Sequence, residues 1–272
     1  MNQAMEGAAP PDEGRDPVLV DRHAGVLTLT LNRPEQFNAL SEDVLEALQA
    51  AFDDCTRDED LRAVVVAARG RAFCAGHDLK QMRAHAGDRD YYLSLFGRCG
   101  GVMQSIVRCP VPVIARVHGT ATAAGCQLVA SCDLAVASAG ARFAVSGINV
   151  GLFCSTPAVA LTRNVPLKNA FEMLVTGRFI SAEQARAYGL VNHVVPDDEL
   201  DAAVEGLVDA IRAKSPLAVR IGKSMVQRQL GMDLAQAYDY AADVMAENMM
   251  ADDVGEGIDA FIEKRPPHWR GR

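Results

Sequence analysis

Residues 63–79 read AVVVAARGRAFCAGHDL, an apolar run followed by a loop of small residues. The run at 63–68 carries no polar side chain, which is typical of a strand buried on both faces of a parallel sheet. The loop that follows contains glycine at 70 and 76 and leads into a helix that we expect to begin near Asp78. A buried strand, a glycine-containing loop and a helix in this order predict a strand–helix unit.

The same order recurs further along the chain. Residues 111–117 form a second apolar strand, and His118 to Gln127 form a second loop of small residues. We expect a helix from about Cys126 to Ser131 and a strand from Asp133 to Ser138. Strands and helices that alternate in this way, with right-handed crossovers, predict an α/β fold.

Sequence pattern divides the chain into three parts. Residues 1–17 are rich in Ala, Pro, Gly, Asp and Glu, and we expect them to form a disordered tail. Residues 18–196 are expected to form the α/β core. Residues 197–272 are almost wholly helical in pattern, and we expect them to serve oligomerisation.

The composition indicates a folded domain that does not bind nucleic acid or span a membrane. The 272 residues are 49% hydrophobic and carry a formal net charge of −8. An acidic surface disfavours binding to a phosphate backbone, and no basic stripe with interleaved aromatic residues is present. No run of eighteen apolar residues occurs, so we expect no transmembrane helix.

The cysteines and the first residues predict a cytoplasmic location. Seven cysteines are present with no CxxC pair, which favours reduced thiols over a disulfide framework or a metal site. Residues 1–17 lack the apolar run of a secretory signal and the Arg-rich, acid-poor composition of a transit peptide.

The two loops of small residues, 70–79 and 118–127, are candidates for a ligand site. Each follows a strand and precedes a helix, so each leaves backbone N–H groups free at the start of that helix. Two such N–H groups that converge on one oxygen atom would form an oxyanion hole, and the helix dipole would strengthen it. Spacing alone favours the alternative, which is ordinary tight packing between strand and helix.

An ordered set of short motifs between about residues 18 and 268 resembles the crotonase, or enoyl-CoA hydratase/isomerase, superfamily. In chain order the set is NRP at 32–34, NAL at 38–40, AFCAGHDL at 72–79, PVIA at 112–115, Gly119, AGCQL at 124–128, CD at 132–133, TG at 176–177, ISA at 180–182, GLV at 189–191 and AFIEKR at 260–265. The resemblance implies a spiral of ββα units with a helical C-terminal region, assembled as a homotrimer or a dimer of trimers.

The resemblance also implies an acyl-CoA thioester as substrate or ligand, with no further cofactor. The thioester carbonyl would lie between the backbone N–H groups of His77 and Ala124, where family members usually have glycine at the second position. The residues expected along the CoA moiety are Arg33, Phe37, Ala75, Asp78, Leu79, Phe261 and Lys264. The last two match residues that often reach a neighbouring subunit's ligand; the alternative for them is helix packing and a solvated cation.

The chain departs from the hydratases of this superfamily at both acid–base positions. Where hydratases have two glutamates, this chain has Gln127 and Gly147. A glutamine amide can orient water but does not exchange a proton at neutral pH, and glycine leaves only space. General acid–base groups contribute about 10²–10⁴ in rate, so we expect hydration of 2-enoyl-CoA to be slow. An enzyme with another reaction and a non-catalytic acyl-CoA-binding protein both remain open.

The segment after Gly147 resembles one subgroup of the superfamily, named enoyl-CoA hydratase domain-containing protein 3, through residues 73–79 and the run from Gly151 to Pro157. Cys154 within that run is a candidate nucleophile, although no base is paired with it in the sequence; the alternative is a buried structural thiol. We expect Asp78 and Asp133 to be capping residues.

Overall fold

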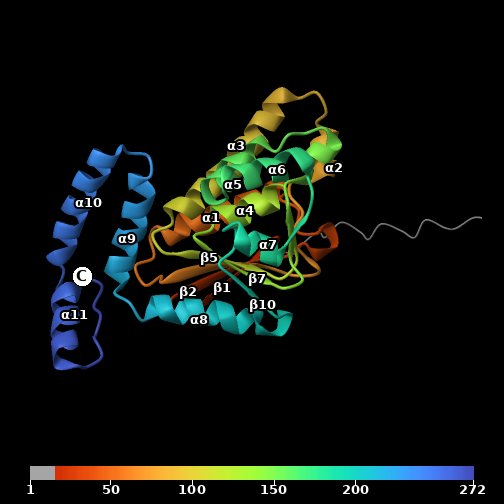
Figure 1. Cartoon of the computed structure of the whole chain (residues 1–272). Coiled ribbons are helices and arrows are strands. Elements are labelled where there is room, and N and C mark those ends of the chain that lie inside the picture. The colour runs from red at the N-terminus through yellow and green to blue at the C-terminus, as the bar shows by residue number, and fades with distance from the viewer. Residues whose placement is uncertain (1–15) are drawn as a thin grey trace, which may run out of the picture.

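A six-stranded sheet forms the base of the α/β core (Figure 1). The computed structural model describes residues 16–272, so residues 1–15 of the expected tail lie outside the described part. Along the sheet the strands are β1 (Val18–His23), β2 (Val26–Leu31), β3 (Ala63–Ala68), β5 (Val113–Val117), β7 (Leu134–Ser138) and β10 (His193–Val195). β1 is antiparallel to β2, and the remaining neighbours are parallel.

A second, smaller sheet is built from four short strands. Its strands, in order, are β4 (Ala72–Cys74), β6 (Thr120–Thr122), β8 (Arg142–Ala144) and β9 (Ile180–Ser181). Each of β3, β5 and β7 is followed by a strand of the small sheet and then by a helix, which makes three successive ββα units. The predicted α/β spiral is therefore confirmed. The sequence did not predict β6 inside the second loop, because three residues are too few to show an alternating pattern.

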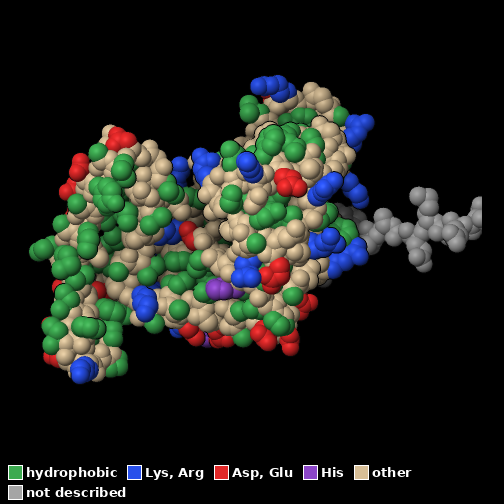
Figure 2. All heavy atoms as spheres, in the orientation of Figure 1, with side chains coloured by type: hydrophobic (Ala, Val, Ile, Leu, Met, Phe, Trp, Pro, Cys, Tyr) green, Lys and Arg blue, Asp and Glu red, His purple; other side chains and the backbone are tan. Residues whose placement is uncertain are grey.

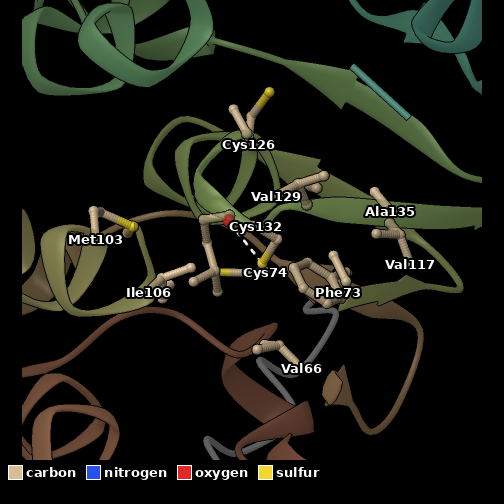
Figure 3. Packing of buried hydrophobic residues seen from close by; sticks show 14 of the residues in the cluster. Val66, Phe73, Cys74, Met103, Ile106, Val117, Cys126, Val129, Cys132 and Ala135 are labelled. Atoms are coloured by element: carbon tan, nitrogen blue, oxygen red, sulfur yellow. Dashed lines mark hydrogen bonds between the residues drawn. The ribbon is translucent and has the colours of Figure 1, made fainter. Parts of the chain in front are cut away.

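Helices cover the upper face of the large sheet and enclose the main core. They are α1 (Glu42–Cys55), α2 (Leu79–Ala84), α3 (Arg89–Arg108), α4 (Ala124–Ser131), α5 (Ser155–Asn164), α6 (Leu167–Thr176) and α7 (Ala182–Ala187), with the short 3-10 helices η1 (Pro34–Gln36) and η2 (Ser146–Val150). Figure 3 shows the part of the core around Phe73, where Val66 of β3, Ile106 of α3 and Val129 of α4 meet. Ser41 caps α1, because its side-chain oxygen accepts a hydrogen bond from the Val44 backbone N–H.

The helix α8 (Leu200–Arg212), which follows η3 (Asp197–Glu199), covers the opposite face of the large sheet. A second apolar cluster joins Leu200, Val204 and Val208 of α8 to Val65 and Ile114 of the sheet. This explains why all six residues of β3 are buried, as the unbroken apolar run predicts.

The last three helices form an arm that extends from the core (Figure 1). They are α9 (Pro216–Gln229), α10 (Leu234–Met249) and α11 (Asp252–Glu263), and neither α9 nor α10 contains a buried residue. Apolar side chains are exposed along the arm (Figure 2). The extent of helix after residue 197 agrees with the expected C-terminal helical region; its expected role in oligomerisation stays a prediction.

Asp133 holds the arm to the core rather than capping a strand or helix. Its carboxylate accepts hydrogen bonds from the Val113 backbone N–H, at 2.7 Å, and from Lys223 Nζ of α9, at 2.6 Å. Lys223 also donates to the backbone carbonyls of Ile106 and Val111. The expectation of a capping role at Asp133 is therefore wrong, because its partner lies 90 residues away in the sequence.

Candidate active site

The two loops of small residues meet at the start of α4. A Cβ atom built on Gly76 would lie 3.3 Å from the backbone nitrogen of Ala124 and 2.9 Å from the Cβ of Ala123. A Cβ atom on Gly125 would lie only 2.2 Å from the carbonyl oxygen of Cys74, so glycine is required at that position. The backbones of residues 74–76 and 123–125 are thus in direct contact.

Backbone N–H groups on both loops are free. Across residues 16–272, no protein group accepts a hydrogen bond from the N–H of His77 or of Ala124. Ala123, just before α4, has φ 51° and ψ −120°, a conformation that is rare for a residue other than glycine. The N-terminus of α4 has no side-chain cap, so its positive dipole end is available to a ligand.

The imidazole of His77 is held as a neutral ring. It packs edge-on against Phe96 of α3 with ring centroids 5.4 Å apart, and within the described chain neither of its nitrogens has a hydrogen-bond partner. Burial lowers the pKa of His77 below its usual value, and the neighbouring Leu40 carbonyl opposes that shift. The arrangement agrees with a contribution of His77 through its backbone.

Gln127 lies one turn into α4, on the same side of the helix as Ala124. Gln127 is only 4% exposed. Its Oε1 atom is buried, and no group of residues 16–272 donates a hydrogen bond to it. A buried carbonyl oxygen without a donor is uncommon in folded proteins. The position at which the family resemblance implies the first glutamate is therefore occupied by a neutral amide with unused hydrogen-bonding capacity.

Gly147, where the family resemblance implies the second glutamate, does not face open space as the sequence led us to expect. A Cβ atom on Gly147 would lie 2.7 Å from the Sγ atom of Cys154 and 2.7 Å from the carbonyl oxygen of Leu152. The backbone N–H of Leu152 donates to the Gly147 carbonyl at 3.0 Å, which closes this turn. That part of the expectation is wrong, because the chain folds back and fills the volume that a side chain would need.

The cysteines are all free and buried, as predicted for reduced thiols, and Cys154 is 6% exposed. Burial raises the pKa of Cys154, while a hydrogen bond from the Gly147 backbone acts in the opposite direction. Burial also raises the pKa of Cys126, which neighbours Cys154, to about 12. A protonated thiol that packs against Gly147 agrees better with the structural alternative for Cys154 than with a nucleophile.

Most of the residues expected along the CoA moiety lie beside the first loop. The N–H of Ala75 donates to the Phe37 carbonyl at 3.0 Å, and the N–H of Leu40 donates to the Gly76 carbonyl at 2.8 Å. Leu79 is exposed, Arg71 stacks over the Phe37 ring, and Asp78 caps α2, as its sequence position indicates. Arg33, just before η1, has a buried Nη1 atom with no acceptor among residues 16–272.

Phe261 and Lys264 are not brought to these loops within one chain. Phe261 lies on α11 of the arm and is 84% exposed, and Lys264 ends that helix with φ 57°. The sequence did not predict two ring contacts: Tyr92 stacks on Phe96 within α3, and His85, which ends α2, stacks on Tyr91 of α3. The i, i+4 spacing of Tyr92 and Phe96 is the sequence signal that could have predicted the first contact.

Residues 16–272 contain neither a membrane-spanning helix nor a cluster of metal-ligating side chains. No helix there is long and apolar enough to cross a membrane. No group of three or more His, Cys, Asp or Glu side chains in that range could hold a metal ion.

The two sheets, the ββα units and the helical C-terminal region define an α/β protein of the crotonase fold. A family model described as enoyl-CoA hydratase/isomerase matches residues 21–272, and the chain belongs to that family. Enoyl-CoA hydratase domain-containing protein 3, mitochondrial, of Mus musculus is 46% identical over 245 residues, which cover 90% of this chain and 81% of that protein.

Solved structures agree with this assignment. An enoyl-CoA hydratase of Mycobacterium smegmatis is 60% identical with a TM-score of 0.92, over 94% of this chain and 99% of that one. Human enoyl-CoA hydratase domain-containing protein 3 is 45% identical with a TM-score of 0.90, over 93% and 100% of the two chains. The resemblance noted in the sequence, including the subgroup, is confirmed.

The expected cytoplasmic location is overturned by the same comparison. The relatives from mouse, frog, rat and human, each 46% identical to this chain, are named as mitochondrial proteins. The expectation depended on the unpaired cysteines and on the composition of residues 1–17, and the relatives' names conflict with it.

Proposed function

We propose that this protein binds acyl-CoA thioesters and polarises the thioester carbonyl between the backbone N–H groups of His77 and Ala124. The observation that carries the proposal is the contact between two loops that each offer a free N–H group. A thioester carbonyl oxygen has two lone pairs and can accept from both donors. The CoA moiety would follow Arg33, Phe37 and the loop around Ala75.

The expected chemical effect is stabilisation of negative charge on the thioester oxygen. Fixed donors do this without reorganising, and the dipole of α4 adds to the field at the Ala124 N–H. Removal of one such donor in an enzyme typically slows catalysis by about 10²–10³. Alanine at 124 keeps the N–H group, so its methyl affects the shape of the pocket and not the number of donors.

Hydration of 2-enoyl-CoA is expected to be slow in this site. Gln127 has no exchangeable acid–base proton at neutral pH, and Cys154 and the Leu152 carbonyl fill the volume beside Gly147. The same two observations favour a second candidate function, a protein that binds acyl-CoA thioesters without acid–base chemistry. A turnover assay separates the two candidates.

Assembly as a homotrimer or a dimer of trimers is part of the proposal. Large apolar side chains of the arm are exposed at Leu230, Leu234, Tyr238, Met245, Met249, Met250, Phe261 and Ile262. Exposed apolar surface on this scale is typical of an interface. In such an assembly Phe261 and Lys264 of one protomer would reach the CoA of its neighbour.

Infrared spectroscopy of a bound thioester tests the polarisation directly. We expect the carbonyl stretch of butyryl-CoA, labelled with ¹³C at the carbonyl, to move to lower wavenumber when the protein binds it. S-butyl-CoA, which lacks the carbonyl, should bind at least tenfold more weakly. Equal binding of the two ligands, or an unshifted carbonyl band, would reject the proposed oxyanion hole.

A further inference from the structure

Cys55 and Cys109 form a pair of thiols that takes no part in the proposed oxyanion hole. Cys55 is the last residue of α1, Cys109 directly follows α3, and the two are 0% and 2% exposed. The Cys55 thiol can donate a hydrogen bond to the Cys109 sulfur and to the Ala51 carbonyl, which lies 3.2 Å away. Earlier along the same helices, Gln49 Nε2 donates to Ser105 Oγ at 2.8 Å. The adjacent ends of α1 and α3 therefore hold the two sulfur atoms in contact.

The surroundings of Cys109 favour its thiolate. The hydrogen bond from the Cys55 thiol lowers the pKa of Cys109, and burial opposes this shift. The Val111 backbone N–H also donates to the Cys109 sulfur, and the Lys223 ammonium adds a positive charge nearby. Lys223 is held there because it donates to the Val111 carbonyl at 2.9 Å and to the Asp133 carboxylate at 2.6 Å. The Asp133 charge acts against the thiolate, but Lys223 lies beside both groups.

The remaining five cysteines do not share this arrangement. Burial raises the pKa of each of them, namely Cys74, Cys99, Cys126, Cys132 and Cys154. The thiolate, and not the thiol, reacts with oxidants, so cysteines of equal burial differ in reactivity. Cys109 is therefore the residue at which oxidation of the folded chain is expected to begin.

We propose that hydrogen peroxide oxidises Cys109 and that Cys55 then closes an intramolecular disulfide with it. The Cys109 thiolate attacks one oxygen of the peroxide, and the O–O bond breaks to leave a sulfenic acid and hydroxide. The Cys55 sulfur then attacks the sulfenic sulfur, and the Cys55 proton leaves with the displaced hydroxide as water. With the proton that Cys109 released on ionisation, two thiols and one peroxide give one disulfide and two water molecules.

The position of the pair at the ends of two helices allows this reaction. Residues 56 and 57, which follow Cys55, are exposed, and helix ends open more readily than helix centres. Sulfur atoms that already share a hydrogen bond can approach to the S–S length of about 2.05 Å by side-chain rotation and a small shift of the helix end. The disulfide would join α1 to α3 beside Lys223, where the arm is held to the core.

Peptide mapping of the intact chain tests the proposal without a variant. The folded protein is treated with hydrogen peroxide, its remaining thiols are alkylated, and trypsin is added without a reducing agent. Trypsin places Cys55 in residues 23–57, because proline follows Arg33, and it places Cys109 in residues 109–116. We expect mass spectrometry to find these two peptides joined, and dithiothreitol to separate them. Absence of a disulfide, or one between other cysteines in its place, would overturn the proposal.

Serine variants test the order of the two steps. In C55S the sulfenic acid at Cys109 has no partner thiol, so dimedone should label Cys109. C109S should form no disulfide, and its Cys55 should oxidise at least tenfold more slowly than Cys109 does in C55S. C99S, at a cysteine of equal burial, is the matched control and should keep the disulfide. Circular dichroism confirms that each variant is folded, and equal oxidation of Cys55 in C109S and of Cys109 in C55S would contradict the assignment of Cys109 as the first site.

Discussion

The thiol of Cys154 occupies the position from which a side chain at residue 147 would grow. Sγ lies 2.7 Å from the place of a Cβ atom on Gly147, well inside the contact distance of carbon and sulfur. Cys154 immediately precedes α5, and Gly147 lies in η2, so their contact packs the two ends of the turn between these helices against each other. The glycine at 147 and the buried thiol of Cys154 are consequently one structural feature.

This contact predicts that residues 147 and 154 are coupled in stability. G147A should destabilise the protein by about 1–3 kcal/mol, the range for overpacking a filled site. In a C154G background the same substitution should cost less, because the thiol is gone and only the Leu152 carbonyl must move. Urea unfolding of the four proteins in this double-mutant cycle measures the coupling. Additive effects would show that Cys154 and Gly147 do not compete for space.

The same contact predicts how hydratase activity could be introduced. Q127E/G147E should fold poorly or remain inactive toward crotonyl-CoA, because the second glutamate has no room. Q127E/G147E/C154G should gain hydration by at least tenfold over the unmodified protein, since general acid–base groups contribute about 10²–10⁴. Loss of the conjugated-thioester absorbance measures the rate. Equal rates in the double and triple variants would contradict the steric explanation.

Position 124 offers a test of the backbone donor. A124G keeps the N–H group and should bind butyryl-CoA at least as well as the unmodified protein. A124P removes the N–H group at the first helical position of α4, where proline is tolerated in many helices. We expect A124P to weaken thioester binding at least tenfold, with S-butyl-CoA binding unchanged. Circular dichroism checks that A124P is folded, and equal loss for both ligands would indicate a distorted pocket instead.

Local sequence pattern was sufficient to predict an element of the fold wherever a single strong pattern marked that element. The unbroken apolar run of β3 is buried along its whole length, and Asp78 caps α2, as the sequence predicts. The three-residue strands β4 and β6 were not predicted, because they are too short to show a period. Hydrogen bonding across the small sheet, a tertiary effect, defines them.

The candidate site, too, could be predicted from the sequence only in part. The two loops and the replacements at 127 and 147 could be read from residue types and order. The crowding at Gly147 could not, because it depends on how residues 152–154 fold back on that glycine. The unpaired Oε1 of Gln127 and the ion pair of Asp133 with Lys223 likewise require long-range contacts that no local pattern encodes.

The ion pair between Lys223 and Asp133 predicts how the arm is held. The Lys223 side chain is only 7% exposed, so K223M leaves the Asp133 carboxylate buried without its partner. Removal of one member of a buried pair typically costs about 3–5 kcal/mol. D133N/K223M should recover much of that loss, because the amide oxygen can still accept from Val113. Urea unfolding gives the values; K168M, at an exposed lysine, should have no effect, and a K223M protein of unchanged stability would contradict the assignment.

The buried ring of His77 predicts a loss of stability in acid. Burial lowers its pKa in the folded state below the usual value of 6.5, so between these two pKa values the unfolded chain binds more protons. The free energy of unfolding contributed by His77 is therefore complete above about pH 6.5 and falls as the pH drops below it. His118, whose pKa burial also lowers, contributes in the same direction and will remain in any His77 variant.

H77F should reduce the slope of unfolding free energy against pH between pH 7 and 5, and it should preserve the packing against Phe96. H77N, which also cannot titrate, should reduce the slope equally while losing the ring contact, so its stability at pH 7 should be lower than that of H77F. Urea unfolding at several pH values provides the comparison. An H77F slope equal to that of the unmodified protein would mean that the imidazole titrates alike in the folded and unfolded chains.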